Sequence, residues 1–242
     1  MSRSKKLSLN RILLKISGES FGTEEPFCLS HIDSIIAEMV EIYHAGVDFG
    51  VVMGGGNILR GSALEKRGIP RNIGDEMGML ATVINALLLS ELLKSQKIKV
   101  AIITPRMIEG IGESYQPQRC LDYLENHTVL LFAGGTGHPY FTTDTAAALR
   151  AVEIQAQCLF KGTKVDGVYA NYTSDECRGC LLDVLTYQQV LAEQYKIMDL
   201  TAITLCMENR LPIRIFNLIK PGNLLRAIKG EVGTLVTYES TK

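Results

Sequence analysis

The sequence lacks any appreciable net charge, and this absence limits the partners that the chain can have. Its 242 residues include 25 Lys and Arg and 26 Asp and Glu, so the formal net charge at pH 7 is −1. A near-neutral chain gives no reason to propose nucleic acid or an anionic membrane as its main partner. Any positive surface must therefore be local, such as the lining of a phosphate pocket.

Targeting segments and long apolar runs are missing as well. Residues 1–10 contain lysines, but the apolar stretch at residues 12–16 is short and is interrupted by Lys15. This pattern does not fit a signal peptide, and no apolar run reaches membrane-spanning length. We therefore expect a cytoplasmic protein whose thiols are reduced.

Paired metal-binding motifs are also absent from the sequence. Six cysteines are scattered along the chain, and only Cys177 and Cys180 form a CxxC motif. A zinc half-site and a redox pair are the alternatives, but no second CxxC and no pair of histidines would complete a metal site. We predict two thiols in a surface hairpin.

The chain does contain a regular alternation of strand-like and helix-like segments up to residue 161. The pattern predicts strands at residues 11–16, 47–53, 99–104, 128–133 and 158–161, and helices at residues 30–44, 75–93, 118–125 and 142–157. Strands separated by helices of this length form βαβ units around a mostly parallel sheet with both faces covered. The predicted fold is an α/β, three-layer αβα sandwich, in which ligands bind outside the carboxyl ends of the strands.

The pattern changes after residue 161. We expect short strands at 165–169 and 180–185 around a polar hairpin, helices at 187–194 and 199–209, a strand at 213–217, a helix that begins at Pro221 and an edge strand at 233–238. This part can form a second lobe that closes a cleft against the first.

Three glycine-containing turns follow predicted strands and indicate phosphate binding. Their sequences are Lys15-Ile16-Ser17-Gly18, Gly54-Gly55-Gly56 and Gly134-Gly135-Thr136-Gly137. Glycines let bare backbone N–H groups approach an anion, and the N-terminus of a following helix adds a positive field. The turns at 54–56 and 134–137 are rich in glycine, and the turn at 15–18 adds a lysine. Together they point to transfer of a phosphoryl group from one bound phosphate to another.

Two common nucleotide-binding motifs fail to match. Residues 56–62 have the GxxxxG spacing of a P-loop, but the lysine before Ser62 is missing, so a Walker-type NTPase is not indicated. Residues 54–56, with Asp75 about 20 positions further on, resemble a dinucleotide fingerprint. The third glycine is absent, however, and Asp75 is predicted to open a helix, which argues against a nicotinamide enzyme.

Charged residues near these turns have both a structural and a functional interpretation. Lys15 interrupts an apolar strand, as edge residues do, but at the strand end its ammonium can reach a transferred phosphoryl group. Arg60 is either a solvated helix arginine or a charge over the phosphates, and Asp75 is either a helix N-cap or a ribose acceptor. Asp144 and Asp199 either cap predicted helices or orient Lys15, water or metal.

Six segments together resemble the bacterial-type UMP kinases of the amino-acid kinase family. They are residues 11–19, 54–61, 74–82, 135–144, 164–168 and 198–200, in order and with similar spacing, so the resemblance covers nearly the whole chain. It implies the reaction ATP + UMP → ADP + UDP in de novo pyrimidine nucleotide synthesis. It also implies one domain over residues 1–242, with mainly UMP binding and phosphoryl transfer in 1–160 and mainly ATP binding in 161–242.

The same resemblance implies the site residues. Lys15, Asp144 and Asp199 are expected to be catalytic. The residues expected to bind ATP are Lys15, Ile16, Ser17, Gly18, Gly56, Arg60, Thr163, Tyr169 and Tyr172. The residues expected to bind UMP are Gly55, Asp75, Thr136, Gly137, His138, Pro139, Tyr140, Phe141, Thr142 and Thr143. The expected cofactor is Mg²⁺ carried by ATP, with no metal held by the protein alone.

The resemblance further implies a homohexamer that UTP inhibits and GTP often activates. Two departures bear on these expectations: Tyr172 stands where many relatives carry an aspartate followed by proline, and residues 22–27 differ from the loop linked to the GTP response. Two rival interpretations remain open. One is a kinase of the same fold with a carboxylate or carbamate acceptor, and the other is a non-catalytic protein that senses or stores nucleotides.

Overall fold

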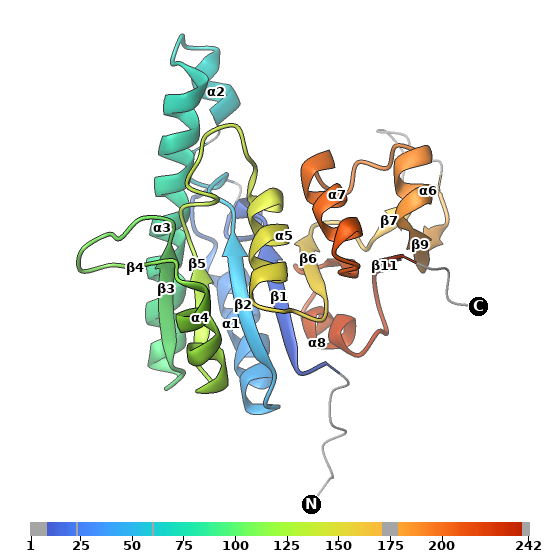
Figure 1. Ribbon diagram of the computed structural model, residues 1–242, viewed down its shortest axis with the longest axis horizontal. Helices are drawn as coiled ribbons and strands as arrows, with labels where there is room; N and C mark the ends of the chain where they lie inside the picture. The colour runs from blue at the N-terminus through green and yellow to red at the C-terminus, as the bar shows by residue number, and fades with distance from the viewer. Residues whose placement is uncertain (1–8, 23, 60, 171–178, 239–242) are drawn as a thin grey trace, which may run out of the picture.

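The computed structural model describes residues 9–22, 24–59, 61–170 and 179–238, which form an α/β fold (Figure 1). The strands are β1 (Arg11–Ile16), β2 (Asp48–Met53), β3 (Val100–Thr104), β4 (Glu113–Ser114), β5 (Val129–Phe132), β6 (Leu159–Thr163), β7 (Val168–Tyr169), β8 (Leu181–Leu182), β9 (Val184–Thr186), β10 (Ile213–Asn217) and β11 (Thr234–Thr237). The helices are the 3₁₀ turn η1 (Gly18–Ser20), α1 (Leu29–His44), α2 (Gly61–Glu65), α3 (Arg71–Ser95), α4 (Pro117–Glu125), α5 (Thr143–Glu153), α6 (Tyr187–Ala192), α7 (Leu200–Glu208) and α8 (Asn223–Ile228).

Nine strands form one sheet in the order β4-β3-β5-β2-β1-β6-β10-β11-β9. The neighbouring strands are parallel except for β10 and β11, which are antiparallel. The strands β7 and β8 form a separate hairpin. Because β1, β2, β5 and β6 adjoin one another, the turns that follow them lie along one edge of the sheet, where ligands bind in such folds.

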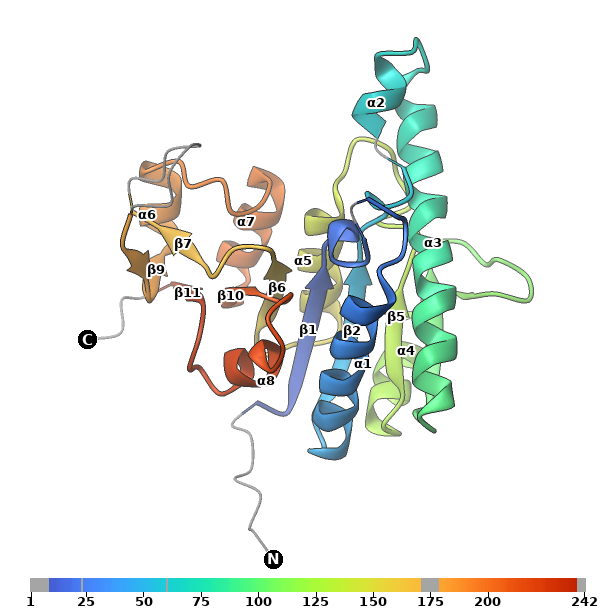
Figure 2. The same cartoon turned by 180° about the vertical axis from the view of Figure 1, so that it is seen from behind.

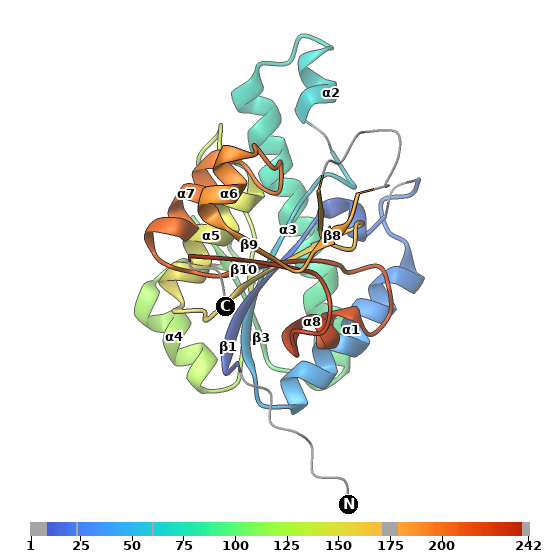
Figure 3. The same ribbon diagram turned by 90° about the vertical axis from the view of Figure 1, so that its right-hand side faces the viewer.

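Helices cover both faces of the sheet. Figure 2 shows α1, α3 and α8 on one face, and the sheet lies between them and the helices α4, α5, α6 and α7 in Figure 3. Each face has its own apolar core, and the two cores meet different sides of the same strands. The predicted three-layer αβα fold with a mostly parallel sheet is therefore confirmed.

Strand β1 illustrates how the sequence positions the site. Ile12, Leu14 and Ile16 enter the core beside α1, whereas Leu13 enters the core beside α5. Since successive side chains of a strand point to opposite faces, Lys15 leaves the sheet on the α5 side. A strand with apolar side chains on both of its faces is typical of a parallel sheet that helices cover on both sides.

Helix α3 begins earlier than predicted. The sequence predicted its start at Asp75, but the helix begins at Arg71 after Pro70, so Asp75 is not its N-cap. Gly74 discourages a helix locally, yet it lies against α2, where an added Cβ atom would be in ordinary contact with the Gly61 Cα atom at 3.7 Å. The tertiary contact outweighs the local preference.

The C-terminal strands were also predicted incorrectly in part. The segment at 180–185 divides at Asp183 into β8, which pairs with β7, and β9, which pairs with β11 in the main sheet. The segment at 233–238 is therefore not an edge strand, because β11 lies between β10 and β9. Two helix starts differ as well: α1 is capped by Cys28 in place of Ser30, and α8 begins at Asn223 in place of Pro221.

Helix α3 is long and apolar enough, by length and composition, to cross a membrane, contrary to the expectation that no apolar run reaches this length. About 44% of its most apolar window is buried inside the fold, however, as in the core helix of many soluble proteins. Its outer face exposes five large apolar side chains at helical spacing, namely Ile73, Met77, Leu80, Ile84 and Leu87. Helix α1 packs its apolar face into the core.

The surface hairpin predicted for the CxxC motif is described only in part. Cys180 is exposed and is not in a disulfide, while Cys177 lies outside the described residues.

Candidate active site

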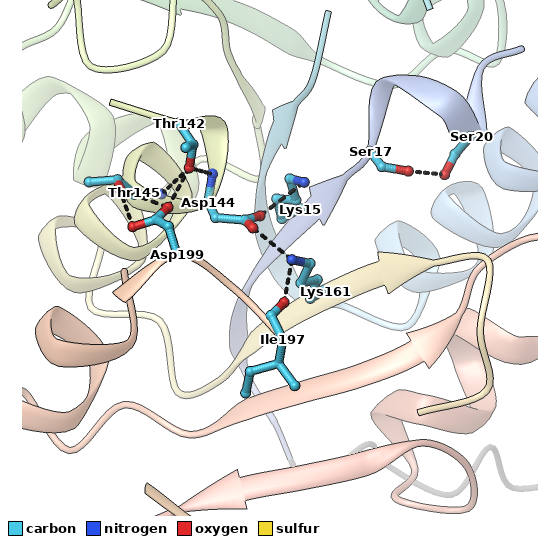
Figure 4. A network of polar contacts seen from close by, with 9 residues as sticks. All are labelled: Lys15, Ser17, Ser20, Thr142, Asp144, Thr145, Lys161, Ile197 and Asp199. Carbon is cyan, nitrogen blue, oxygen red and sulfur yellow. Dashed lines mark hydrogen bonds and ion pairs between the residues drawn. The ribbon is translucent and has the colours of Figure 1, made fainter. Parts of the chain in front are cut away.

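Two lysines and one aspartate form a buried charge cluster near the middle of the sheet (Figure 4). Lys15 of β1 and Lys161 of β6 are register partners on adjacent parallel strands, so their side chains leave the sheet on the same face. Asp144, in the first turn of α5, contacts both of them. Its Oδ1 atom is 2.9 Å from Lys15 Nζ, and its Oδ2 atom is 2.6 Å from Lys161 Nζ.

Burial and charge act against each other in this cluster. Burial alone would raise the pKa of the Asp144 carboxyl, but the positive charges of Lys15 and Lys161 outweigh burial and hold that pKa below its usual value. Burial lowers the pKa of Lys161, and the Asp144 carboxylate offsets part of this effect. The cluster holds two basic side chains and one acidic side chain, which favours an anion beside it.

Asp199 lies close to the cluster but has different partners. Its Oδ1 atom accepts hydrogen bonds from the Ala202 backbone N–H and from Thr145 Oγ1, both at 2.9 Å. Its Oδ2 atom accepts one from Thr142 Oγ1, the side chain that caps α5. Asp199 is thus the N-cap of α7, the structural alternative of the sequence analysis, and it also joins the starts of α5 and α7. Asp144 is not a cap, since Thr142 fills that position.

The turn after β1 packs backbone to backbone on the turn after β2. The Gly54 N–H donates to the Ile16 carbonyl at 2.9 Å. A Cβ atom on Gly18 would lie 2.4 Å from the Gly56 nitrogen, so only glycine fits there. Ser17 precedes Gly18 at the N-cap of η1. Two of the three glycine-containing turns are therefore one packed unit at the carboxyl ends of adjacent strands.

A cavity of about 160 Å³ opens between the turns after β2 and β5 and the first half of α3. Seven residues predicted to bind UMP line it, namely Gly55, Asp75, Thr136, His138, Phe141, Thr142 and Thr143. Gly56, which is predicted to bind ATP, lines it too. Gly137, Pro139 and Tyr140 belong to the same segment but do not contribute to the lining.

Asp75 connects α3 to the segment 136–143. Its Oδ2 atom accepts a hydrogen bond from the Tyr140 backbone N–H at 2.8 Å and lies 3.7 Å from Arg71 Nε. The Arg71 guanidinium also lies over the Tyr140 ring, 5.2 Å from its centroid. Tyr140 has a φ of +73°, which is uncommon for a residue with a Cβ atom, so these contacts hold an otherwise unfavourable turn.

The other predicted ATP residues lie further along the chain. Thr163 ends β6, two positions after Lys161, and its Oγ1 donates to the Val165 carbonyl at 2.8 Å. Tyr169 lies in β7, in the small hairpin with β8. Arg60 and Tyr172 lie outside the described residues.

A larger hollow, of about 710 Å³, lies away from this site. It is formed by the C-terminal end of α3, by β3 and by the connection from β3 to β4. Its lining contains none of the site residues predicted from the sequence, and its two lysines, Lys94 and Lys99, are exposed. The chemistry of the chain therefore points to the smaller cavity.

The family follows from a match that covers most of the chain. The model of the amino acid kinase family matches residues 10–217. The chain belongs to the amino acid kinase family. This confirms the resemblance that the six sequence segments indicated, and the described fold agrees with it.

Named relatives within the family cover the whole chain. The uridylate kinase of Photorhabdus laumondii is 42% identical over 242 residues, which are 99% of this chain and 100% of that protein. The uridylate kinase of Pectobacterium atrosepticum is also 42% identical, over 98% of this chain and 100% of its own length. The similarity therefore extends through both halves of the sheet.

Solved structures agree with these relatives. The crystal structure of UMP kinase from Bacillus anthracis superposes with a TM-score of 0.92 at 31% identity, covering 96% of this chain and 97% of its own. The UMP kinase of Ureaplasma parvum has a TM-score of 0.89 at 30% identity, covering 95% of this chain and 99% of its own.

The sequence did not lead to Lys161 as a site residue. The structure places it beside Lys15. A signal was present, since Lys161, like Lys15, is a lysine within an apolar strand segment. The pairing register of β1 and β6 brings the two together, and this register cannot be read from a single sequence. Two buried residues of α3, Thr82 and Asn85, were also missed.

Proposed function

We propose that this protein transfers the γ-phosphoryl group of ATP to UMP and releases ADP and UDP. The observation that carries the proposal is the cluster of two lysines and one aspartate, Lys15, Lys161 and Asp144, beside the glycine-rich turns. The cluster lies in a chain that is similar over its full length to uridylate kinases. Positive charge and bare N–H groups are what two phosphates need in order to approach one another.

The residues around the cluster and the turn after β1 are our proposed ATP-phosphate site. Lys15, with Ile16, Ser17 and Gly18, supplies the charge and the first turn, and Gly56 faces them from the next strand. Thr163, Tyr169 and the undescribed Arg60 and Tyr172 complete the proposed ATP set. Six of these nine residues lie within 1–160 and three within 161–242, so the proposed ATP site draws on both lobes.

The cavity between the two glycine-rich turns is the proposed UMP site. Gly55 and Asp75 form one side of it, and the segment Thr136–Thr143 forms the other. Asp75 is a carboxylate residue of the lining, and a carboxylate can accept a hydrogen bond from a ribose hydroxyl. Because the cavity adjoins the first turn, both phosphates can reach the edge of the sheet near Lys15.

The proposed reaction needs no general base. A UMP phosphate oxygen, already ionised near neutral pH, forms a bond to the γ-phosphorus while the bond from that phosphorus to the bridging oxygen breaks. ADP leaves with the electron pair. Lys15 and Lys161 stabilise the charge on the transferred group, and Asp144 holds both ammonium groups on one side of it. Orientation of the two nucleotides can supply roughly 7–11 kcal/mol of the barrier.

The donor set of the site fits Mg²⁺ that is bound through ATP. Both oxygens of Asp144 contact lysines, and both oxygens of Asp199 accept from hydroxyl groups. Within the described ranges, no group of three or more metal-ligating side chains occurs. Mg²⁺ is commonly held by substrate phosphates and water, and when bound it would neutralise charge on the phosphates.

Regulation, assembly and location are part of the same proposal. The exposed apolar face of α3 supports a homo-oligomer, proposed as a hexamer in the cytoplasm, since an apolar face of this kind commonly marks an interface. We propose UTP as feedback inhibitor, GTP as activator and a place in pyrimidine nucleotide synthesis. Light scattering and rate measurements with added UTP or GTP test these points.

The reaction is tested by ADP formation from Mg-ATP with UMP, CMP, dUMP, aspartate or carbamate offered separately. Turnover with UMP is the expected result. Turnover with aspartate or carbamate alone would favour a different acceptor on the same fold. Tight UTP binding with no turnover would favour the non-catalytic alternative, which the full-length similarity to uridylate kinases does not support.

A further inference from the structure

Two buried polar side chains of α3 contact the two glycine-rich turns that line the cavity. Thr82 is 1% exposed and Asn85 is 0% exposed, and they lie three residues apart on one face of the helix. We propose that Thr82 and Asn85 are positioning residues, which set the separation of the two turns and hence of the two phosphates. This inference rests on the proposed phosphoryl transfer.

Asn85 holds the turn after β2. Its Nδ2 atom donates to the Gly54 carbonyl at 2.7 Å and to Asn57 Oδ1 at 2.8 Å, while Asn57 Nδ2 donates back to Asn85 Oδ1 at 3.0 Å. Asn57 Nδ2 also donates to the Pro26 carbonyl at 2.7 Å. An amide pair, buried at Asn85 and half-buried at Asn57, therefore links α3, the first glycine turn and the loop before α1.

The same turn packs directly on the α3 backbone. A Cβ atom on Gly55 would lie 2.7 Å from the Gly78 carbonyl oxygen and 2.8 Å from Ala81 Cβ. The turn thus approaches α3 as closely as two backbones allow. Any displacement of α3 along this contact would move the turn with it.

Thr82 holds the turn after β5. Its Oγ1 accepts a hydrogen bond from the Gly134 backbone N–H at 2.7 Å and donates to the Met79 carbonyl at 2.7 Å. The single hydroxyl proton is therefore used within α3, and the oxygen is left to accept from the turn. Gly134 has a φ of +78°, so this bond fixes a turn whose course depends on glycine.

The geometry makes α3 a common support for both turns. Strands β2 and β5 are adjacent, so the turns start from neighbouring positions. One turn of α3 then bonds to each of them through a different side chain. In-line transfer requires reacting atoms at near-contact distance, and a misplacement of about 1 Å can cost about 10²-fold in rate. Small shifts of either turn would therefore lower kcat before they abolish binding.

Ser90 offers a matched control on the same helix. It is 1% exposed, like Thr82, but its hydroxyl has no hydrogen-bond partner in the described part of the chain. Ser90→Ala removes a buried hydroxyl that holds no turn. Thr82→Val removes the hydroxyl that holds Gly134 and keeps the side-chain shape, and Thr82→Ser keeps that hydroxyl.

The test compares single-turnover UDP formation, KM for each nucleotide and Tm in these variants and in Asn85→Leu. We expect Thr82→Val and Asn85→Leu to lower the rate per folded molecule at least about tenfold, with KM values within about threefold. Thr82→Ser should recover the rate to within about twofold, and Ser90→Ala should match the unsubstituted protein. Asn85→Asp retains the side-chain size and removes the donor to Gly54, so the first turn is tested even if Asn85→Leu does not fold.

A lower Tm with an unchanged rate per folded molecule in Thr82→Val and Asn85→Asp would overturn the inference, because it is the result of a purely structural role. Failure of Thr82→Ser to recover the rate would also overturn it. Turnover of UMP by the unsubstituted protein distinguishes a wrong positioning role from a wrong proposed function. If it does not turn over UMP, the function is wrong and the positioning role falls with it; if it does, only the positioning role is at stake.

Discussion

The turn after β2 and the turn after β5 each contain three glycines, yet their backbones differ. Gly134, Gly135 and Gly137 have φ values of +78°, +57° and +81°, in the left-handed region that favours glycine. None of the glycines at 54–56 has a positive φ. The second turn therefore needs glycine for its conformation, and the first turn must need it for another reason.

Space is the reason in the first turn. A Cβ atom on Gly54 would lie 2.7 Å from the Gly18 nitrogen, and one on Gly55 would lie 2.7 Å from the Gly78 carbonyl oxygen. The first turn is thus confined between β1 and α3, next to Lys15. The second turn leads into the segment 138–143, where Tyr140 and Phe141 are 64% and 51% exposed.

This difference indicates that the two turns have different roles. A turn that is packed on its neighbours presents its N–H groups rigidly, as charge stabilisation in a transition state requires. A turn that leads into an exposed segment can form one wall of an open cavity and contact a second nucleotide. Lys15, beside the first turn, should therefore affect kcat. Asp75, which binds the exposed segment after the second turn and lines the cavity, should affect KM for UMP. Thr82 differs from Asp75, because it sets the position of the second turn and is expected to affect the rate.

The largest effect is expected on the first-turn side. Lys15→Ala should lower kcat by about 10²–10³-fold, the scale for losing one preorganised charge. ADP formation at saturating UMP measures it. Lys94→Ala is the control, because Lys94 is exposed and pairs only with Glu91 among the contacts described. A near-normal kcat in Lys15→Ala would remove Lys15 from the mechanism.

The second-turn side should respond in KM. Asp75→Ala removes the acceptor of the Tyr140 N–H and an acceptor in the cavity wall. We expect KM for UMP to rise about 10–100-fold, as for a hydrogen bond to a charged group, with little change in kcat. Initial rates over a range of UMP concentrations measure both, with exposed Glu76→Ala as the neighbouring control. An unchanged KM would mean that Asp75 only shapes the loop.

The two reasons for glycine can be tested by stability. Gly55→Ala should lower the free energy of unfolding by about 1–3 kcal/mol, because its methyl group overlaps the α3 backbone. Gly56→Ala is the matched control within the same turn. No atom lies within 4 Å of its added Cβ, so a change within about 0.5 kcal/mol is expected. Urea unfolding measures both variants.

The second turn supplies the opposite case. Gly135 has a positive φ but no atom closer than 3.7 Å to an added Cβ. Asparagine tolerates this conformation better than a β-branched residue does, so Gly135→Asn should be more stable than Gly135→Val. Equal losses in the two variants would show that crowding, and not conformation, decides the second turn as well.

The smallest effect concerns pH. Burial lowers the pKa of Lys161 below its usual 10.5, so its ammonium is lost at a lower pH than that of an exposed lysine. We expect kcat to fall as the pH rises through this pKa, by about half at that pH. In Lys161→Arg, which stays protonated, the fall should move to higher pH. The uracil ring of UMP also ionises at high pH, but this affects both proteins alike. Identical pH profiles of kcat in the unsubstituted protein and in Lys161→Arg would therefore exclude Lys161 as the titrating group.

Local patterns were enough for much of the fold. The five main strands and four long helices through residue 161, and the glycine turns at strand ends, were predicted in the right order, because apolar periodicity and glycine act over a few residues. The short elements α2 and β4 were not predicted. Errors arose where distant segments compete. The division of 180–185 into β8 and β9 depends on the pairing partner of each half, and the start of α3 at Arg71 depends on the packing of α2.

The candidate site shows the same limit. Lys15 was identified because a lysine at the end of an apolar strand is locally unusual. Lys161 has the same character but was missed, and only its register with Lys15 reveals it. The roles of all these residues stay predictions until the variants above are measured, as does the division into a UMP lobe and an ATP lobe.

The sequence by itself determined the α/β class, the positions of the turns and the family, since these depend on local residue patterns and on motifs in a fixed order. Only the tertiary structure decided that Asp144 lies between Lys15 and Lys161, and that Thr82 and Asn85 each hold one glycine turn. The physical reason is that these contacts join residues that are 17 or more positions apart in the chain. Their geometry depends on strand register and helix packing, which no single segment encodes.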